Sequence, residues 1–200
     1  IKSLAHSMGF FACGIAKAVP VDEAVAQKYR KWLENGEEAS MAYMTNYLEK
    51  RLDPRLLVPG VRSIVSLALN YAPAQQLPKG EYQIAAYALG LDYHDLMKQK
   101  MRELAIKITE RWQLPKQEEG EEPSVRCFCD TAPVLERYWA QKAGLGWVGR
   151  NHQLIIPHAG SMFFLGEIFL PFDVDVYDEA MSNRCGSCHR CIDACPTRAI

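Results

Sequence analysis

Apolar residues recur at helical spacing in two long segments of the chain. Between Asp22 and Gly36, four apolar side chains fall on one face of a helix. After Asp92, apolar positions step by four, three, four and four residues and end at Trp112. Both segments begin at an aspartate that can cap a helix, and the first ends at a glycine that can terminate one. The pattern therefore predicts two amphipathic helices.

Strands are predicted where β-branched and aromatic residues alternate with small or polar ones between turn residues. The clearest run follows Pro59-Gly60 and stops before Pro73. A third helix is expected over 133–143, ended by Gly144. Strands and helices mix without regular alternation, so we expect an α/β or α+β fold with a mixed or antiparallel sheet and flanking helices. The predicted strands cover 10–18, 61–71, 124–129, 153–156 and 161–170.

Composition and charge limit the classes of function. The formal net charge is −1 and basic residues are spread over both halves of the chain, so any nucleic-acid contact must be a local patch. Unbroken apolar runs fall far below the ~18 residues that a membrane span requires, and we expect no membrane partner. Residues 115–123 carry four glutamates and are predicted to form a solvated loop.

The chain contains seven cysteines, and four of them fall within eleven residues near its end. Disulfide frameworks are seldom distributed in this way, and no positively charged, apolar leader opens the chain. We therefore expect thiolates in a reducing compartment and a cytoplasmic protein. Cys127 and Cys129 are expected to be small buried thiols. Because the chain lacks an initiator Met and stops soon after Cys195, we also expect a fragment cut within a domain.

The run Cys185-x2-Cys188-x2-Cys191-x3-Cys195-Pro196 has the ferredoxin-type spacing of a [4Fe–4S] site. The first three cysteines would bind one cluster. The fourth is expected to begin a helix and, as in two-cluster ferredoxins, can belong to a second cluster. The alternative is a zinc site, which usually pairs two Cys-x2-Cys hooks across a longer spacer. The spacing favours iron–sulfur chemistry and therefore electron transfer.

A second dense motif lies between Arg126 and Asn151. It predicts a strand, a carboxylate at the end of that strand, a helix and a glycine-rich turn, which is the layout of an active site. Within it stand Asp-Thr-Ala-Pro-Val-Leu-Glu-Arg, which begins at Asp130, and Gly-Leu-Gly-Trp-Val-Gly, which begins at Gly144.

These two motifs, in this order before the cysteine run, resemble those of the epoxyqueuosine reductases. The segments 50–55, 87–94 and 160–167 add to the resemblance, which covers nearly the whole chain. Two stretches depart from the usual pattern of the family, namely 150–152 and 197–198. Neither departure touches a cysteine of the run.

The resemblance implies a cobalamin-dependent enzyme with two [4Fe–4S] clusters, related to reductive dehalogenases. Such an enzyme reduces epoxyqueuosine at the wobble position of tRNA to queuosine. The implied domains are a nitroreductase-like, cobalamin-binding catalytic domain over 1–175 and the truncated start of a ferredoxin-like domain over 176–200. The implied partners are tRNA carrying epoxyqueuosine and an external electron donor, and a monomer is expected.

Removing the epoxide oxygen takes two electrons and two protons, so the reaction needs a proton donor. Asp130 is the acid that the matched motif supplies, and we predict that it donates the proton from a pocket that desolvates it. The alternative is a helix N-cap, because Asp before Thr-Ala-Pro also suits that position. Together with Asp130, the weaker candidates for cofactor binding are Arg55, Tyr93, His94, Asn151 and Ser161, each with an ordinary structural alternative.

Two other functions fit parts of the sequence. An iron–sulfur electron-transfer module that docks a partner reductase would need neither cobalamin nor Asp130. A corrinoid-binding protein would not need the cysteine run. For the enzyme, the matched motifs fall at strand–helix transitions, so Arg55, Tyr93 and Asp130 are expected to converge on one pocket.

Overall fold

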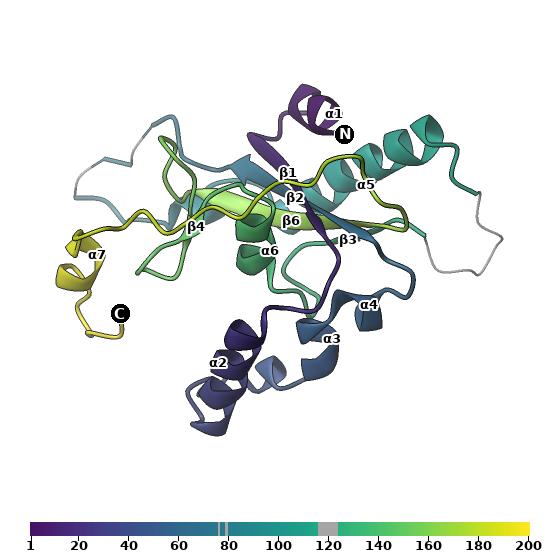
Figure 1. Ribbon diagram of the computed structural model, residues 1–200. Coiled ribbons are helices and arrows are strands. Elements are labelled where there is room, and N and C mark those ends of the chain that lie inside the picture. Colours follow the sequence, from purple (N-terminus) through teal and green to yellow (C-terminus); the bar gives the residue numbers. More distant parts are fainter. Residues whose placement is uncertain (76, 79, 116–123) are drawn as a thin grey trace.

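A computed structural model of the chain describes residues 1–75, 77–78, 80–115 and 124–200 (Figure 1). The predicted acidic loop over 115–123 lies outside these residues, except for Pro115. The described chain forms a central antiparallel sheet with helices packed on both faces. This confirms the expected mixture of helices with an antiparallel sheet.

The central sheet has four strands in the order β1, β2, β6, β3, and each neighbouring pair is antiparallel. A separate two-stranded ribbon pairs β4 with β5. The five predicted strands are present with shorter bounds, and β4 lies in the predicted glycine-rich turn. The strands are β1 Ala12–Lys17, β2 Ser63–Asn70, β3 Arg126–Phe128, β4 Trp147–Val148, β5 Leu154–Ile155 and β6 Phe163–Leu170.

Side chains of the two central strands divide between two hydrophobic clusters. Val65 and Ile168 pack in the cluster that contains the buried face of α5 (Tyr93–Arg111). Ile64 and Phe169 pack in the cluster that contains α6 (Glu136–Lys142). Because neighbouring residues of a strand point to opposite faces, α5 and α6 cover opposite faces of the sheet (Figure 1).

Two strand glycines let these helices approach the sheet closely. A Cβ on Gly14 of β1 would lie 1.9 Å from the carbonyl oxygen of Ala143, just after α6. On the other face, a Cβ on Gly166 of β6 would lie 2.7 Å from the sulfur of Met101 in α5. Any larger residue at Gly14 would push the end of α6 away from the sheet, and with it the loop that precedes the helix.

Short elements surround this core. In Figure 1, α2 and the helices that follow it extend from one side of the sheet, and α7 lies near the C-terminal end. These elements are α1 Lys2–Ser7, α2 Glu23–Glu34, η1 Ala42–Met44, α3 Leu48–Leu52, α4 Pro54–Leu57, η2 Ala86–Ala88 and α7 Arg190–Asp193.

The two long predicted helices are confirmed as α2 and α5, but two local predictions are wrong. The third helix begins at Glu136 rather than at 133. The Thr131 N–H donates to the Cys129 carbonyl at 2.6 Å, so the chain turns tightly before a helix can start. Cys195 does not begin a helix in the described part of the chain, since it follows α7.

Candidate active site

Asp130 follows β3 at a turn that leaves its side chain half exposed. Its φ is +55°, a left-handed conformation that aspartate tolerates better than most residues. The side chain is 45% exposed and lines a cavity, so Asp130 is less desolvated than its predicted role requires. The N-cap alternative is wrong, because Leu135 occupies the N-cap position of α6.

Tyr93 and His94 lie beside Asp130 at the start of α5. Asp92 caps this helix by accepting a hydrogen bond from the His94 backbone N–H at 2.9 Å. The Tyr93 hydroxyl donates to Asp130 Oδ2, and His94 Nε2 lies 3.7 Å from the same oxygen. The Tyr93 ring stacks on Phe164 of β6, with 4.0 Å between ring centroids. Burial, and then the hydrogen bond to Asp130, raises the pKa of Tyr93, so its hydroxyl stays protonated and donates.

Two further carboxyl groups lie behind Asp130. Glu136 Oε1 accepts a hydrogen bond from the Asp130 backbone N–H at 2.6 Å. Glu167 on β6 is fully buried, and neither of its carboxyl oxygens has a hydrogen-bond partner in the described part of the chain. Burial, and then the charge of neighbouring carboxylates, raises the pKa of Glu136 and of Glu167 well above the usual range. Both groups therefore favour the neutral, protonated form.

Glu136 and Glu167 were not among the predicted site residues, although both belong to the motifs that carry the resemblance. The available signal was an acid within the otherwise apolar run of β6, Phe-Phe-Leu-Gly-Glu-Ile-Phe-Leu. An acid at such a position is buried if the strand is central, and a buried acid with a raised pKa is a candidate for proton transfer. The strand order that makes β6 central is not visible in the sequence.

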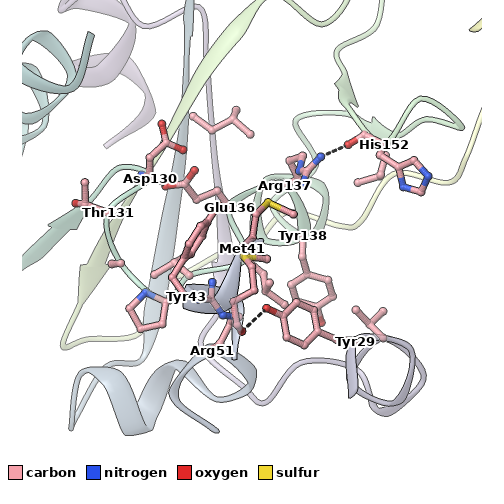
Figure 2. A pocket seen from close by; sticks show the side chains of 18 of the residues that line it. Tyr29, Met41, Tyr43, Arg51, Asp130, Thr131, Glu136, Arg137, Tyr138 and His152 are labelled. Carbon is pink, nitrogen blue, oxygen red and sulfur yellow. Dashed lines mark hydrogen bonds between the residues drawn. The ribbon is translucent and has the colours of Figure 1, made fainter. Parts of the chain in front are cut away.

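A cavity of about 1130 Å³ is lined by Asp130 and Glu136 and by residues of the α2–α3 region. Its volume slightly exceeds that of typical small-molecule sites, which occupy ~300–1,000 Å³. Figure 2 shows Asp130 and Glu136 on one side of this cavity, and Arg51 with Tyr29 and Tyr43 on another. The cavity therefore offers acidic and basic groups at separate places on a largely apolar and aromatic lining.

Arg51 and Arg55 lie on adjacent short helices but in different surroundings. Arg51 on α3 is only 9% exposed and lines the cavity. Arg55 on α4 has a side chain that is 50% exposed and pairs with Asp53 at 2.7 Å. The hydrogen bond with Arg55 lowers the pKa of Asp53, so this pair is ionised at the surface. Tyr93 and Asp130 thus come together, but of the three residues expected to share a pocket only Asp130 is among the cavity-lining residues described. The cofactor roles of Arg55 and Tyr93 stay predictions.

Asn151 and Ser161 occupy turns on either side of β5. The Asn151 side chain accepts a hydrogen bond from the Gln153 backbone N–H at 3.1 Å. The Ser161 carbonyl accepts one from the Phe163 N–H at 3.0 Å. Neither is among the cavity-lining residues in the described ranges, so their predicted contacts with a cofactor remain predictions.

The cysteine run lies in the last segment, and its side chains suit iron–sulfur ligation. All four thiols are free, and each is at least partly exposed. The Trp147 indole N–H, and then the backbone near Arg150, lowers the pKa of Cys185. Thr197, and then nearby backbone N–H groups, lowers the pKa of Cys195 to about 7. Such pKa values favour the thiolate, which is the form that binds iron.

Arg150 connects the cysteine run to the turn after β4. Its guanidinium donates to the carbonyl oxygens of Gly186 and Cys188 at 2.9 and 3.0 Å. Within the described ranges, no three His, Cys, Asp or Glu side chains converge as ligands of a single metal ion. By contrast Cys129 is buried as predicted, whereas Cys127 is only partly buried against the same hydrophobic cluster. Burial raises the pKa of Cys127 to about 12.

Comparison with known proteins identifies relatives of the chain. Residues 51–131 match the family described as epoxyqueuosine reductase QueG, DUF1730, and residues 181–200 match the 4Fe-4S binding domain family. An epoxyqueuosine reductase of Cellulophaga algicola is 44% identical over 200 residues, which are 100% of this chain and 62% of that protein. This chain is a homologue of the epoxyqueuosine reductases.

Solved structures agree with this relationship. An epoxyqueuosine reductase from Streptococcus thermophilus superposes with a TM-score of 0.82 at 28% identity, covering 98% of this chain and 51% of that one. A reductive dehalogenase shares the fold alone, with a TM-score of 0.52 at 16% identity over 91% of this chain and 20% of that one. The chain thus spans about 62% of a curated epoxyqueuosine reductase and about half of a solved one. No helix in the described ranges is long and apolar enough to cross a membrane.

Proposed function

We propose that the protein to which this chain belongs reduces epoxyqueuosine to queuosine at the wobble position of tRNA. Residues 1–175 would form its cobalamin-binding catalytic domain, and residues 176–200 the beginning of a ferredoxin-like domain. The observation that carries the proposal is the Asp130 carboxyl, which lines a large cavity and is held by Tyr93. A pure electron-transfer module would not need this arrangement.

Two solved relatives support the assignment of substrate and acid. One epoxyqueuosine reductase, 27% identical to this chain over 98% of it, is described in complex with an epoxyqueuosine-modified tRNA stem loop. Another, from Bacillus subtilis and 26% identical, is described with its catalytic aspartate loop swung out of the active site. Asp130 likewise stands on a loop, immediately after β3.

The reaction removes the epoxide oxygen as water and leaves an alkene, and it consumes two electrons and two protons. When bound, cobalamin supplies a reduced, strongly nucleophilic cobalt that transfers electrons in pairs. The large cavity with aromatic walls and a buried arginine fits a bulky cofactor that carries a phosphate. Asp130 would donate a proton from the cavity wall to the departing oxygen, while the Tyr93 hydroxyl orients the carboxyl by its hydrogen bond.

Glu136 and Glu167 extend the supply of protons behind Asp130. Burial, and then the charge of nearby carboxylates, favours the neutral form of both groups, so they would hold protons close to Asp130. Glu136 already contacts the Asp130 backbone N–H, which brings its carboxyl next to the donor. Closure of the substrate over the half-exposed Asp130 would exclude water from its carboxyl.

The cysteine run would carry electrons to this site from an external donor. Cys185, Cys188 and Cys191 would bind one [4Fe–4S] cluster, and Cys195 would reach towards a second. Arg55, His94, Asn151 and Ser161 remain proposed contacts of the cofactor. A monomer acting in the cytoplasm, where tRNA is modified, completes the proposal.

The test uses the full-length protein, loaded with clusters and mixed with cobalamin under anaerobic conditions. We expect the visible spectrum of cobalamin to change on binding. We also expect a single turnover with epoxyqueuosine-containing tRNA to yield queuosine, detected by mass spectrometry of the released nucleosides. Reduced clusters with no cobalamin binding and no queuosine would instead support an electron-transfer module.

A further inference from the structure

Arg51 is a nearly buried cation, and its side chain has no hydrogen-bond or ion-pair partner among the residues that the structure describes. Its side chain is 9% exposed, and its Nε is buried without a hydrogen-bond acceptor. In the described part of the chain no carboxylate comes within ion-pair distance of its guanidinium. Glu38 contributes to the same electrostatic surroundings near Tyr29, but its buried Oε2 also lacks a hydrogen-bond partner, so the two groups do not neutralise each other by contact.

An unpaired buried guanidinium is unfavourable for folding. Arginine remains charged at every physiological pH, so the group cannot escape burial by losing its proton. Buried charges in proteins are normally paired or hydrogen-bonded, and an uncompensated one destabilises the folded state. Arg51 therefore weakens the ligand-free protein, which suggests that its partner arrives with a ligand.

The position of Arg51 defines where that ligand binds. Figure 2 shows Arg51 beside Tyr29 and Tyr43, away from Asp130 and Glu136. The Tyr29 hydroxyl already donates to the Met44 carbonyl at 2.9 Å, so this neighbour is held in place. A ligand that fills the cavity would place its anionic part at Arg51 and its reacting part near the carboxyl groups.

We propose that Arg51 is an anion subsite of this cavity and binds a phosphodiester group of its ligand. The planar guanidinium matches two phosphate oxygens at once, and such paired hydrogen bonds are strong when water is excluded. Within the proposed function, on which this inference rests, the phosphodiester has two possible sources. It belongs either to the nucleotide loop of cobalamin or to the backbone of the tRNA.

The experiment compares the variants Arg51→Met and Arg51→Lys with the matched control Lys50→Met in the full-length protein. Lys50 is the neighbouring cation on α3 and is exposed, so its removal tests the effect of charge alone. Cobinamide, which has the corrin but no phosphodiester, serves as the companion ligand to cobalamin. If the phosphate of cobalamin binds Arg51, Arg51→Met should weaken cobalamin binding by at least tenfold and leave cobinamide binding unchanged, and Arg51→Lys should weaken it less.

If the phosphate belongs to tRNA, Arg51→Met should lower the affinity for tRNA rather than the affinity for cobalamin. Arg51→Met should then weaken binding of an unmodified anticodon stem loop and lower the salt dependence by about 0.7–0.9 in log Kd per log salt. Cobalamin binding should stay unchanged. If neither affinity changes, or if Lys50→Met has the same effect as Arg51→Met, the proposal is overturned.

A thermal readout separates this inference from the proposed function. Without ligand, Arg51→Met should melt at a higher temperature than the unmodified protein, because it removes an unpaired buried charge. Inorganic phosphate should raise the melting temperature of the unmodified protein but not that of Arg51→Met. These measurements stand even if the protein binds neither cobalamin nor tRNA. A lower melting temperature for ligand-free Arg51→Met, with no difference in the response to phosphate, would show a structural role instead.

Discussion

The Tyr93 hydroxyl donates a hydrogen bond to the carboxylate of Asp130, although the two residues are 37 positions apart in the chain. Tyr93 is held at the first turn of α5, and its ring is stacked against Phe164 on the central strand β6. Asp130 is held by a turn with positive φ after the edge strand β3. Two rigid elements thus position one hydrogen bond, and this geometry leads to the first prediction.

Replacing Tyr93 by Phe should slow epoxide reduction without unfolding the protein. The change removes the hydrogen bond that orients the Asp130 carboxyl, and a hydrogen bond between neutral groups contributes ~0.5–1.5 kcal/mol, so we expect a loss of roughly two- to tenfold in the single-turnover rate. The ring keeps its stacking on Phe164, so the melting temperature should change little. Tyr71→Phe is the matched control, because the Tyr71 ring also packs on Phe164, with centroids 4.5 Å apart. Equal rates for Tyr93→Phe and the unmodified protein would remove Tyr93 from the mechanism.

Asp130 should show a chemical role rather than a structural one. Asn tolerates positive φ about as well as Asp, so Asp130→Asn should keep the turn while it loses the acid. We expect the single-turnover rate to fall by ~10² or more with little change in melting temperature. Asp130→Ala should lose the same activity and also some stability, because Ala is strained at positive φ. Near-normal turnover in Asp130→Asn would exclude proton donation by Asp130.

The free energy of unfolding of the protein should fall as pH rises through and above the ordinary pKa of a glutamate side chain. Glu167 has a raised pKa in the folded state, so its neutral form favours folding below the unfolded pKa of ~4.3, and this stability is lost as pH rises. The glutamine in Glu167→Gln cannot ionise, so the free energy of unfolding of this variant should fall less steeply with pH than that of the unmodified protein. The two slopes should differ by at most ~1.4 kcal/mol per pH unit. The measurement is the free energy of unfolding in urea from pH 5 to 8.

The control for this pH series is Glu34→Gln, which changes an exposed acid at the end of α2. Its free energy of unfolding should change with pH at the same slope as that of the unmodified protein. An identical slope for Glu167→Gln would mean that Glu167 is not a buried proton store. The comparison uses the slope of the free energy of unfolding against pH. A pH-independent loss of stability caused by the glutamine amide therefore does not affect the result.

Cys195→Ala should remove one cluster and spare the other. In the proposed arrangement the first three cysteines would bind one cluster and Cys195 would belong to a second, as in two-cluster ferredoxins. Iron content and electron paramagnetic resonance of the full-length variant should therefore report the loss of a single cluster signal. Cys188→Ala is the matched change within the first cluster and should remove the other signal. If Cys195→Ala and Cys188→Ala remove the same signal, the assignment of Cys195 is wrong.

The candidate site was predictable only where its residues are neighbours in sequence. The cysteine spacing and the strand-to-turn position of Asp130 are local patterns, and both were found without coordinates. Arg51 and Arg55 show the limit of such patterns, because they lie four positions apart in one motif and carry the same charge. Arg55 was the predicted site residue, whereas in the structure Arg51 is buried at the cavity and Arg55 pairs with Asp53 at the surface.

The sequence by itself determined the long helices, the strands and the cysteine run, because helical periodicity, alternation and ligand spacing act over a few residues. Packing between distant segments decided the rest. The order β1, β2, β6, β3 places β6 inside the sheet, which buries Glu167 with no hydrogen-bond partner among the described residues. The close approach of α6 at Gly14 and the stacking of Tyr93 on β6 then bring Asp130, Glu136 and Tyr93 together. Each of these contacts joins residues far apart in the chain, so only the folded arrangement can select them.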